Sequence, residues 1–303
     1  MISSRISLST LSVAIAATLS GGAVAESSTL VFEEVLVTAE KRSESLQDLS
    51  QAITVLDGDD LDTQQISSFV DLSAIAPGVN IAKNEGFKTV ITIRGVGNEA
   101  NQNAIANPSV SYHLDGIYVA SPFALQTDFL DLERIEVLRG PQGTLFGQNS
   151  TGGAINVITQ APTVDDSFGK ADLTLGDYGL VKVRAAYNLP LTETLAVRAS
   201  IISNSRDGFT DNLTLGQDLD DANSVSGRVR VLYEPRENFR ANFTAQIFDE
   251  DRNGAAQKGL LDPTPDAREL RQDSRADFEL TSELYSVVLE WDFEAFSLKS
   301  LTS

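Results

Sequence analysis

A strict two-residue alternation of apolar and polar side chains dominates the C-terminal half of this sequence. In one stretch Val181, Val183 and Tyr187 alternate with Lys182 and Arg184. Because successive side chains of a β-strand point to opposite faces, such a run predicts a strand with one apolar and one polar face. Strands of this kind occur in soluble β-sandwiches and in outer-membrane β-barrels. The pattern covers residues 181–189, 195–201, 228–233, 239–247 and 285–293.

The lengths of the links between these strands favour the barrel. From the second link onward, short and long links alternate. Outer-membrane barrels show this alternation because short turns face the periplasm and long loops face outward, whereas a sandwich gives no reason for it. The predicted links are residues 176–179, 188–193, 207–223, 234–238, 250–282 and 294–295.

Together with the strand that precedes the first link, the five alternating ranges make six strands, and a seventh starts at residues 296–302. Since the smallest closed barrels have about eight strands, we expect the chain to be truncated and to hold only the first part of a barrel. No segment after the N-terminus is apolar over about 20 residues, so a membrane-embedded chain would have to cross as β-strands.

The first 25 residues predict a secretory signal peptide. Arg5 precedes an apolar run at residues 11–19, and the small residues Ala23 and Ala25 form a cleavage pattern. The apolar run is too short for a transmembrane helix, which needs about 20 apolar residues. Residues 26–50 are then expected to form an exported leader.

Composition excludes several kinds of function. The 23 basic and 43 acidic residues give a formal charge of −20, which repels nucleic acid. The sequence has no cysteine and one histidine, His113, which rules out disulfides and thiolate metal sites. Any catalysis would have to rest on carboxylates, hydroxyls or that imidazole, and a secreted carboxylate-dependent enzyme stays an alternative, although the acids cluster in loops. We predict that the chain is no enzyme, with no catalytic residue, no cofactor, no resident metal and no nucleic-acid partner.

Two local patterns resemble a hydrolytic site and a calcium-binding loop, but each lacks a required residue. His113 shares one strand face with Ser111 and Asp115, but the sequence lacks a nucleophile elbow and a second histidine. The run from Asp249 begins like a calcium-binding loop, yet its twelfth position is Leu260, where a glutamate is needed. A structural polar strand and a solvated acidic loop are the plainer interpretations.

Residues 51–166 predict a compact mixed domain. From Asp59 an apolar stripe with helical spacing predicts one helix, capped by Asp59, that ends at Pro77 and Gly78. Strand runs interrupted by helix are typical of an α+β domain. Strands are expected at residues 79–82, 90–94, 110–114, 134–138 and 154–159, with a helical turn near 125–132.

Several runs in this domain resemble the plug domain of TonB-dependent receptors. The longest are LERIEVLRGPQGTLFG at residues 132–147 and TGGAINVIT at residues 151–159. One departure is Ser50, where relatives with this leader often carry proline. Shorter matching runs are PGV at residues 77–79, IRG at 93–95 and VSYHLDGIY at 110–118.

A short β-prone segment in the leader resembles a TonB box. On its own, such a segment fits either a first strand of the next domain or a strand that adds to the sheet edge of a partner. The resemblance favours strand addition, with an inner-membrane-anchored, TonB-type energy-transducing protein as the partner. The segment is Glu34, Val35, Leu36, Val37, Thr38 and Ala39.

The resemblance implies an α+β plug at residues 51–166 inside an antiparallel transmembrane β-barrel of about 22 strands, with residues 167–303 as its first strands. It implies a receptor in the outer membrane of a Gram-negative cell, with plug and box facing the periplasm. The implied function is active uptake of a scarce small molecule, in the first place an iron–siderophore complex. Alternatives are cobalamin, carbohydrate or aromatic compounds, or a receptor that binds or signals without transport.

The resemblance also implies roles for particular residues, although it assigns none to substrate binding. Arg94, Arg139 and Glu136 would contact the barrel wall, because buried arginines without partners cost several kcal/mol. The glycines of the plug motifs would allow tight turns inside a narrow lumen, although ordinary loop glycines fit equally well. These glycines are Gly95, Gly116, Gly140, Gly143, Gly147, Gly152 and Gly153.

A set of arginines lies on the polar face of the alternating strands. They could attract an anionic substrate such as a metal chelate, or they could pair with acidic groups of the plug. The sequence leaves these two alternatives open. The set is Arg184, Arg198, Arg228, Arg230 and Arg240.

Overall fold

The computed structural model describes residues 36–37, 44–45, 51–84, 88–97, 107–121, 125 and 127–303, all within the compact unit Leu36–Ser303. The predicted signal peptide lies outside these residues, as does the predicted TonB box apart from Leu36 and Val37. None of the helices in the described ranges is both long and apolar enough to cross a membrane.

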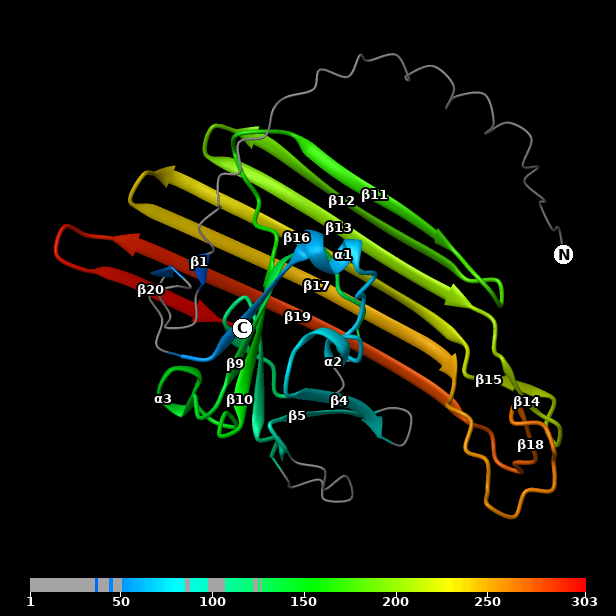
Figure 1. The fold of residues 1–303 in the computed structure, drawn as a ribbon. Helices are drawn as coiled ribbons and strands as arrows, with labels where there is room; N and C mark the ends of the chain where they lie inside the picture. Colours follow the sequence, from blue (N-terminus) through cyan, green and yellow to red (C-terminus); the bar gives the residue numbers. More distant parts are fainter. Residues whose placement is uncertain are drawn as a thin grey trace, which may run out of the picture. The chain divides into compact units, whose positions relative to one another are not determined.

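Seven antiparallel strands form one sheet in the C-terminal half, as the alternation predicts (Figure 1). Their order in the sheet follows the chain. Tight turns at residues 193–194 and 237–238 alternate with long links at 207–221 and 254–276. The strands are β11 (Phe168–Leu175), β12 (Val181–Thr192), β13 (Leu195–Arg206), β16 (Ala222–Arg236), β17 (Phe239–Asn253), β19 (Asp277–Asp292) and β20 (Ser297–Thr302).

Burial in this sheet is the reverse of that in a soluble protein. On β12, Tyr187 is 52% exposed, whereas its neighbour Asn188 is 0% exposed. On β16, Val229 is 43% exposed, between Arg228 at 4% and Arg230 at 8%. An apolar face turned outward and a polar face turned inward are characteristic of a transmembrane barrel.

The N-terminal half is built around a mixed five-stranded sheet. Its order is β3-β9-β10-β7-β8, and only β10 and β7 are parallel. Three short helices and a second, three-stranded sheet accompany it. The strands of the main sheet are β3 (Ile53–Asp57), β7 (Val110–Leu114), β8 (Ile117–Tyr118), β9 (Leu132–Arg139) and β10 (Gly153–Thr159). The other elements are β4 (Val79–Asn84), β5 (Lys88–Ile93), β6 (Val96–Gly97), α1 (Gly58–Thr63), α2 (Leu72–Ile75) and α3 (Gly143–Phe146).

This half has the ordinary apolar core of a soluble domain. Leu72, Ile93, Ile135 and Ile155 are all 0% exposed and belong to one cluster. Phe69, at 1% exposure, packs edge-on against its neighbours in that cluster. Burial of each such side chain stabilises the fold by roughly 1.5–3 kcal/mol.

The single helix predicted from Asp59 to Pro77 is wrong, because two short helices occupy that range. Asp57, and not Asp59, caps α1: its carboxylate accepts from the backbone N–H of Asp59 at 2.9 Å. Before α2, Asp71 accepts from the backbone N–H groups of Ser67 and Ser68 at 3.1 and 2.9 Å. These local side-chain bonds compete with helical hydrogen bonds, which explains the break.

The helical turn predicted near residues 125–132 is wrong over its second half. Residues 127–131 are irregular, and Leu132 already begins β9. The Phe129 N–H donates to the carbonyl of Ser67 at 2.7 Å, so this segment is fixed by a distant partner and not by helical bonds. Asp131 takes a left-handed conformation with φ of 51°, which a helix excludes.

The two long links of the barrel sheet pack together. The first supplies β14 (Thr210–Asn212) and β15 (Gln217–Leu219), and the second supplies β18 (Glu269–Leu270), which pairs in parallel with β14. Arg268 stacks over the rings of Tyr178 and Phe209, at 5.4 and 5.6 Å from their centroids. Since Tyr178 lies between β11 and β12, three links form one structured group.

Candidate functional site

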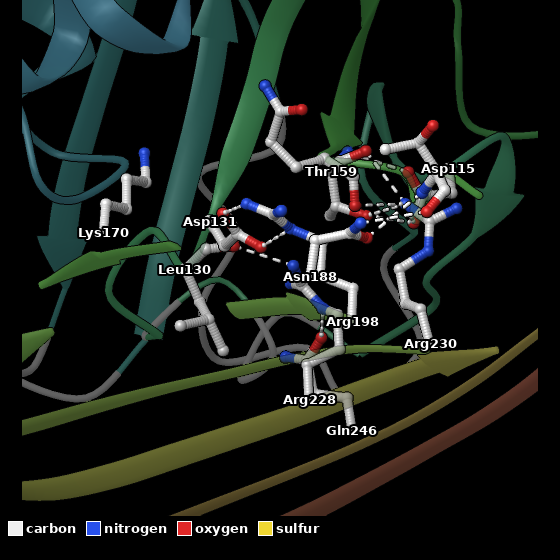
Figure 2. A network of polar contacts seen from close by, with 12 residues as sticks. Asp115, Leu130, Asp131, Thr159, Lys170, Asn188, Arg198, Arg228, Arg230 and Gln246 are labelled. Atoms are coloured by element: carbon white, nitrogen blue, oxygen red, sulfur yellow. Dashed lines mark hydrogen bonds and ion pairs between the residues drawn. The ribbon is translucent and has the colours of Figure 1, made fainter. Parts of the chain in front are cut away.

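The inward polar face of the barrel strands meets the N-terminal domain in a network of polar contacts (Figure 2). At its centre Arg198 of β13 holds Asp131 with two parallel bonds, Nε to Oδ2 at 2.6 Å and Nη2 to Oδ1 at 2.7 Å. Each of these two side chains is 3% exposed. A bidentate, buried pair of this kind fixes orientation as well as distance.

Arg230 of β16 makes the second buried contact. Its Nη1 donates to the carbonyl and the hydroxyl of Thr159, at 2.9 and 2.6 Å, and to the carbonyl of Gln160 at 3.1 Å. Asp115 lies 3.9 Å from the same nitrogen and accepts from both the N–H and the hydroxyl of Thr159, each at 2.8 Å. The end of β10 is therefore tied to the barrel wall through a shared charge network.

The turn that presents Asp115 depends on the residue after it. Asp115 and Gly116 connect β7 to β8 with φ of 50° and 81°, as a two-residue hairpin turn of the Asp-Gly type requires. Nearby, Gly153 has φ of 152°, and a Cβ there would lie 2.3 Å from the carbonyl oxygen of Leu138. At these two positions glycine is required by backbone conformation and by close packing of strands.

Polar contacts at the edge of the interface are more exposed. Asp62 of α1 forms ion pairs with Arg184 at 2.5 Å and with Lys170 at 3.3 Å. Asp128 pairs with Lys182 of β12 at 2.9 Å. Because these pairs are partly solvated, each is expected to contribute about 0–1 kcal/mol.

Asn188 of β12 fixes the segment that leads from the N-terminal domain into β11. Its Nδ2 donates to the carbonyls of Thr163 and Asp166 at 2.9 and 2.7 Å, and its Oδ1 accepts from the N–H of Thr163 at 3.1 Å. The sequence places Asn188 on the polar face but gives no sign of this role.

Arg228 differs from the other buried arginines. Its Nη1 donates to the carbonyl of Leu130 at 2.7 Å and its Nε to the side-chain oxygen of Gln246 at 2.9 Å (Figure 2). Both acceptors are neutral. Among the described residues no carboxylate forms an ion pair with Arg228, although it is only 4% exposed.

Four of the five inward arginines pair with acidic side chains of this chain. Arg184, Arg198 and Arg230 pair with acids of the N-terminal domain. Arg240 pairs with Glu234 across the turn between β16 and β17. The acids were not identified from the sequence, since Asp131 and Arg198 are 67 positions apart and no local pattern connects them.

The residues predicted to contact the barrel lie within the N-terminal domain. Arg139 donates to the carbonyl of Pro77 at 3.0 Å and to the hydroxyl of Thr54. Burial, and then the nearby positive charge of Arg94, lower the pKa of Arg139. The structure thus brings the two arginines together, and their pairing with barrel carboxylates stays a prediction.

Glu136 lies inside the five-stranded sheet and is 0% exposed. Its two carboxylate oxygens accept from Arg134 at 2.9 Å and from Asn156 at 3.1 Å. Both partners belong to the same sheet, so Glu136 is part of its internal network. The barrel contact predicted for it remains a prediction.

The described part of the predicted TonB box is extended. Leu36 and Val37 form β1 (Leu36–Val37), which pairs antiparallel with β2 (Glu44–Ser45). The calcium-loop pattern has no loop geometry, because Asp249 and Asp251 lie on strand β17. No group of three or more acidic or histidine side chains suited to a metal ion occurs among the residues that the structure describes.

Comparison with known proteins identifies the N-terminal domain. Residues 45–154 match the profile of the TonB-dependent Receptor Plug Domain family. The chain is 31% identical over 211 residues to the pesticin receptor of Yersinia pestis, covering 66% of this chain and 30% of the relative. It is 29% identical over 219 residues to the ferric enterobactin receptor PirA of Pseudomonas aeruginosa, covering 66% and 29%.

Solved structures support the fold. The ferric yersiniabactin uptake receptor FyuA from Yersinia pestis superposes with a TM-score of 0.71 at 22% identity, covering 80% of this chain and 39% of that one. The ferripyoverdine receptor of the outer membrane of Pseudomonas aeruginosa gives a TM-score of 0.71 at 18% identity, covering 86% and 34%.

The chain spans under a third of the length of the two sequence relatives, 30% and 29%. All four proteins are receptors, in agreement with the prediction that this chain is not an enzyme. The chain shares its fold with the two solved receptors, and residues 45–154 match the plug domain family. Residues 45–154 therefore form a plug domain of the TonB-dependent receptor family, and the chain as a whole is similar to part of such outer-membrane receptors.

Proposed function

We propose that the receptor containing this chain takes up an iron–siderophore complex across the outer membrane, with energy supplied by a TonB-type protein. The observation that carries the proposal is the buried, charged plug–barrel interface, centred on Arg198 and Asp131. A plug held by ion pairs and hydrogen bonds can leave and return without exposing its apolar core. The similarity to a ferric enterobactin receptor and to a ferric yersiniabactin uptake receptor supports iron chelates as the substrate class.

The domain arrangement follows from the same proposal. Residues 1–25 are a cleaved signal, 26–50 a periplasmic leader, 51–166 the plug and 167–303 the first barrel strands. The tight turns at 193–194 and 237–238 face the periplasm, and the long links face outward. Clustered aromatic rings next to the short turns, Phe239, Trp291 and Phe293, suit a membrane interface.

Energy coupling is proposed to use the segment Glu34–Ala39. A strand has two hydrogen-bonding edges, and the pairing of β1 with β2 occupies one of them. Among the described residues only β2 pairs with Leu36 and Val37, so their other edge could take an added strand from the partner, which would gain affinity from main-chain hydrogen bonds. This gives the TonB-type protein a site that does not depend on side-chain chemistry.

The coupling proposal is tested by replacing Val37 with proline in the full-length receptor. Proline removes a backbone N–H and is poorly tolerated in a paired strand. Uptake of a radiolabelled ferric chelate should therefore fall to background, while binding of the chelate to cells kept on ice should be unchanged. Leu46→Pro, in the same leader outside the box, is the matched control and should transport normally. Normal uptake by Val37→Pro would refute coupling through this segment.

A further inference from the structure

A groove of about 770 Å³ crosses the outward face of the barrel sheet from β11 to β19 (Figure 1). The strand register places its floor on two neighbouring rows of outward residues, where six positions carry glycine or alanine. Larger side chains, including Tyr187, Ile201 and Tyr285, complete the lining. The six small residues are Gly169, Ala171, Ala185, Ala199, Gly227 and Ala245.

The groove runs obliquely through the apolar band of the sheet. On β19 the outward residues are apolar or aromatic from Tyr285 to Trp291 and polar at Glu283, so this end of the groove lies at the boundary of the band. On β12 the groove passes Tyr187, and the apolar Val183 still lies between that position and the outer link. One end therefore opens at the outer boundary, and the other end lies inside the apolar band.

A lipid chain fits this groove better than a second copy of the protein does. A two-fold dimer would place the groove against itself, because a two-fold interface uses the same patch on both copies. Two facing hollows would leave an empty space whose walls lose dispersion contacts. A single acyl chain is apolar and narrow, and it can lie along a floor of glycine and alanine from the boundary inward.

Acidic side chains surround the outer end of the groove. Glu283 lies opposite Ile247 in the strand register and accepts from the hydroxyl of Tyr285 at 3.0 Å, so it borders two residues that line the groove. No lysine or arginine occupies an outward position of β17 or β19 as the structure describes them. An anionic headgroup would be repelled here, whereas an ammonium group would be attracted. Further outward acids above Glu283 are Asp249, Asp251 and Glu279.

We propose that this groove holds one acyl chain of a phospholipid whose headgroup ends in an ammonium group, of the phosphatidylethanolamine type. The chain lies along the small residues, and the ammonium group lies next to Glu283. The proposal rests on the proposed orientation of the barrel in the membrane. It does not depend on which solute the receptor takes up.

The test measures lipid retained by the full-length receptor, purified in detergent, by native mass spectrometry. The two probes are phosphatidylethanolamine and the anionic phosphatidylglycerol with identical acyl chains. The receptor should retain one molecule of phosphatidylethanolamine with a preference of about two- to five-fold, the size expected for an exposed charge pair. Equal or stronger retention of phosphatidylglycerol would overturn the proposal.

Gly227→Leu locates the lipid in the groove. A Cβ at Gly227 would lie 3.8 Å from the nearest side-chain atom, Cγ1 of Ile247, so the new side chain fills the groove without displacing the backbone. The retained phosphatidylethanolamine should be lost in this variant. Ala241→Leu, on the outward face of β17 but outside the groove, is the matched control and should retain it. Full retention by Gly227→Leu would contradict the assignment.

Glu283→Gln tests the headgroup contact separately. This variant should still retain a phospholipid but should lose the preference for phosphatidylethanolamine. Glu237→Gln, at an exposed glutamate in the turn at the other end of the strands, is its control and should keep the preference. A preference that survives in Glu283→Gln would overturn the role of this carboxylate.

The lipid proposal and the uptake proposal fail separately. Lipid retention is measured without a chelate, so its failure leaves the uptake function standing. Unchanged lipid retention by a receptor that takes up no ferric chelate would overturn the uptake function alone. Normal gel mobility of each variant with and without heating excludes misfolding as the cause of a loss.

Discussion

The plug and the barrel strands follow opposite rules of burial within one chain. In the plug, Ile135 and Ile155 are fully buried, whereas in the barrel Tyr187 and Val229 face outward and Asn188 and Arg228 face inward. The plug folds as a soluble domain does, by removing apolar side chains from water. The barrel strands turn their apolar side to lipid, so polar side chains supply most of the inward contacts, although Leu284 of β19 packs against the apolar core of the plug.

That difference explains how the two regions are joined. Arg198, Arg230 and Asn188 bond to the plug and its linker, in addition to the apolar contact of Leu284. When an interface of hydrogen bonds and ion pairs opens, water can satisfy the separated groups. The proposed uptake requires the plug to move, and an interface of this kind is compatible with that requirement.

The largest expected effect comes from the buried charge pair that joins the two regions. Asp131→Asn keeps the size and the left-handed backbone of this residue but leaves Arg198 without its carboxylate, which should cost about 3–5 kcal/mol. Chemical denaturation of the purified receptor in detergent measures the loss. Arg184→Gln, at the more exposed pair with Asp62, is the control and should cost about 0–1 kcal/mol.

A double variant sharpens the same comparison. If Asp131 and Arg198 act as a pair, Asp131→Asn combined with Arg198→Gln should be much less destabilised than the sum of the two single variants. Simple additivity would mean that the two side chains stabilise the receptor independently of each other.

The next effect concerns the outward face. In a soluble protein an arginine at a 43% exposed position would be harmless, but Val229→Arg should destabilise the inserted barrel by about 2–4 kcal/mol. Leu261→Arg, in an outer link where the residue is 97% exposed, should leave stability unchanged. Folding titrations into lipid vesicles compare the two, and equal stability of both variants would contradict a lipid-facing Val229.

The sequence predicted these two regions with different success. The barrel strands were predicted because the two-residue period is visible within a single short segment, such as residues 181–189. Detecting it does not require knowledge of the partner strand. The helix of the plug was predicted wrongly because Asp71 bonds to the N–H groups of Ser67 and Ser68, a local competition that an apolar stripe does not reveal.

Contacts between residues far apart in the sequence could not be predicted. The inward arginines were found as a set, but their partners depend on how the plug sits in the lumen. Asp131 gains its role from an irregular segment and a left-handed backbone, neither of which the sequence signals. The parallel pairing of β14 with β18 joins Asp211 to Glu269 and Asn212 to Leu270, each 58 positions apart, and was not predicted either.

The smallest expected effect lies in the outer links. Hydrogen bonds from the hydroxyl and N–H of Thr264, and from the N–H of Arg271, lower the pKa of the exposed Asp262 to about 2. The pKa of an aspartate in an unfolded chain is about 3.9. The stabilisation of the folded link by this carboxylate is therefore fully present above about pH 4 and is lost as the pH falls toward about 2. The protection of the Arg271 amide against hydrogen exchange, relative to an unfolded peptide at the same pH, should fall only in that window. A loss of protection already at about pH 5 would contradict the assignment.

In the proposed barrel the alternating strands face lipid on one side and the plug-filled lumen on the other. Spin labels placed singly by cysteine substitution at each residue from Tyr285 to Asp292 of β19, in the receptor reconstituted into lipid vesicles, test it directly. Accessibility to oxygen, which concentrates in lipid, should peak at Tyr285, Val287, Leu289 and Trp291 and fall at the residues between them. Accessibility without a two-residue period, or with water-soluble quenchers reaching the apolar positions best, would contradict the barrel.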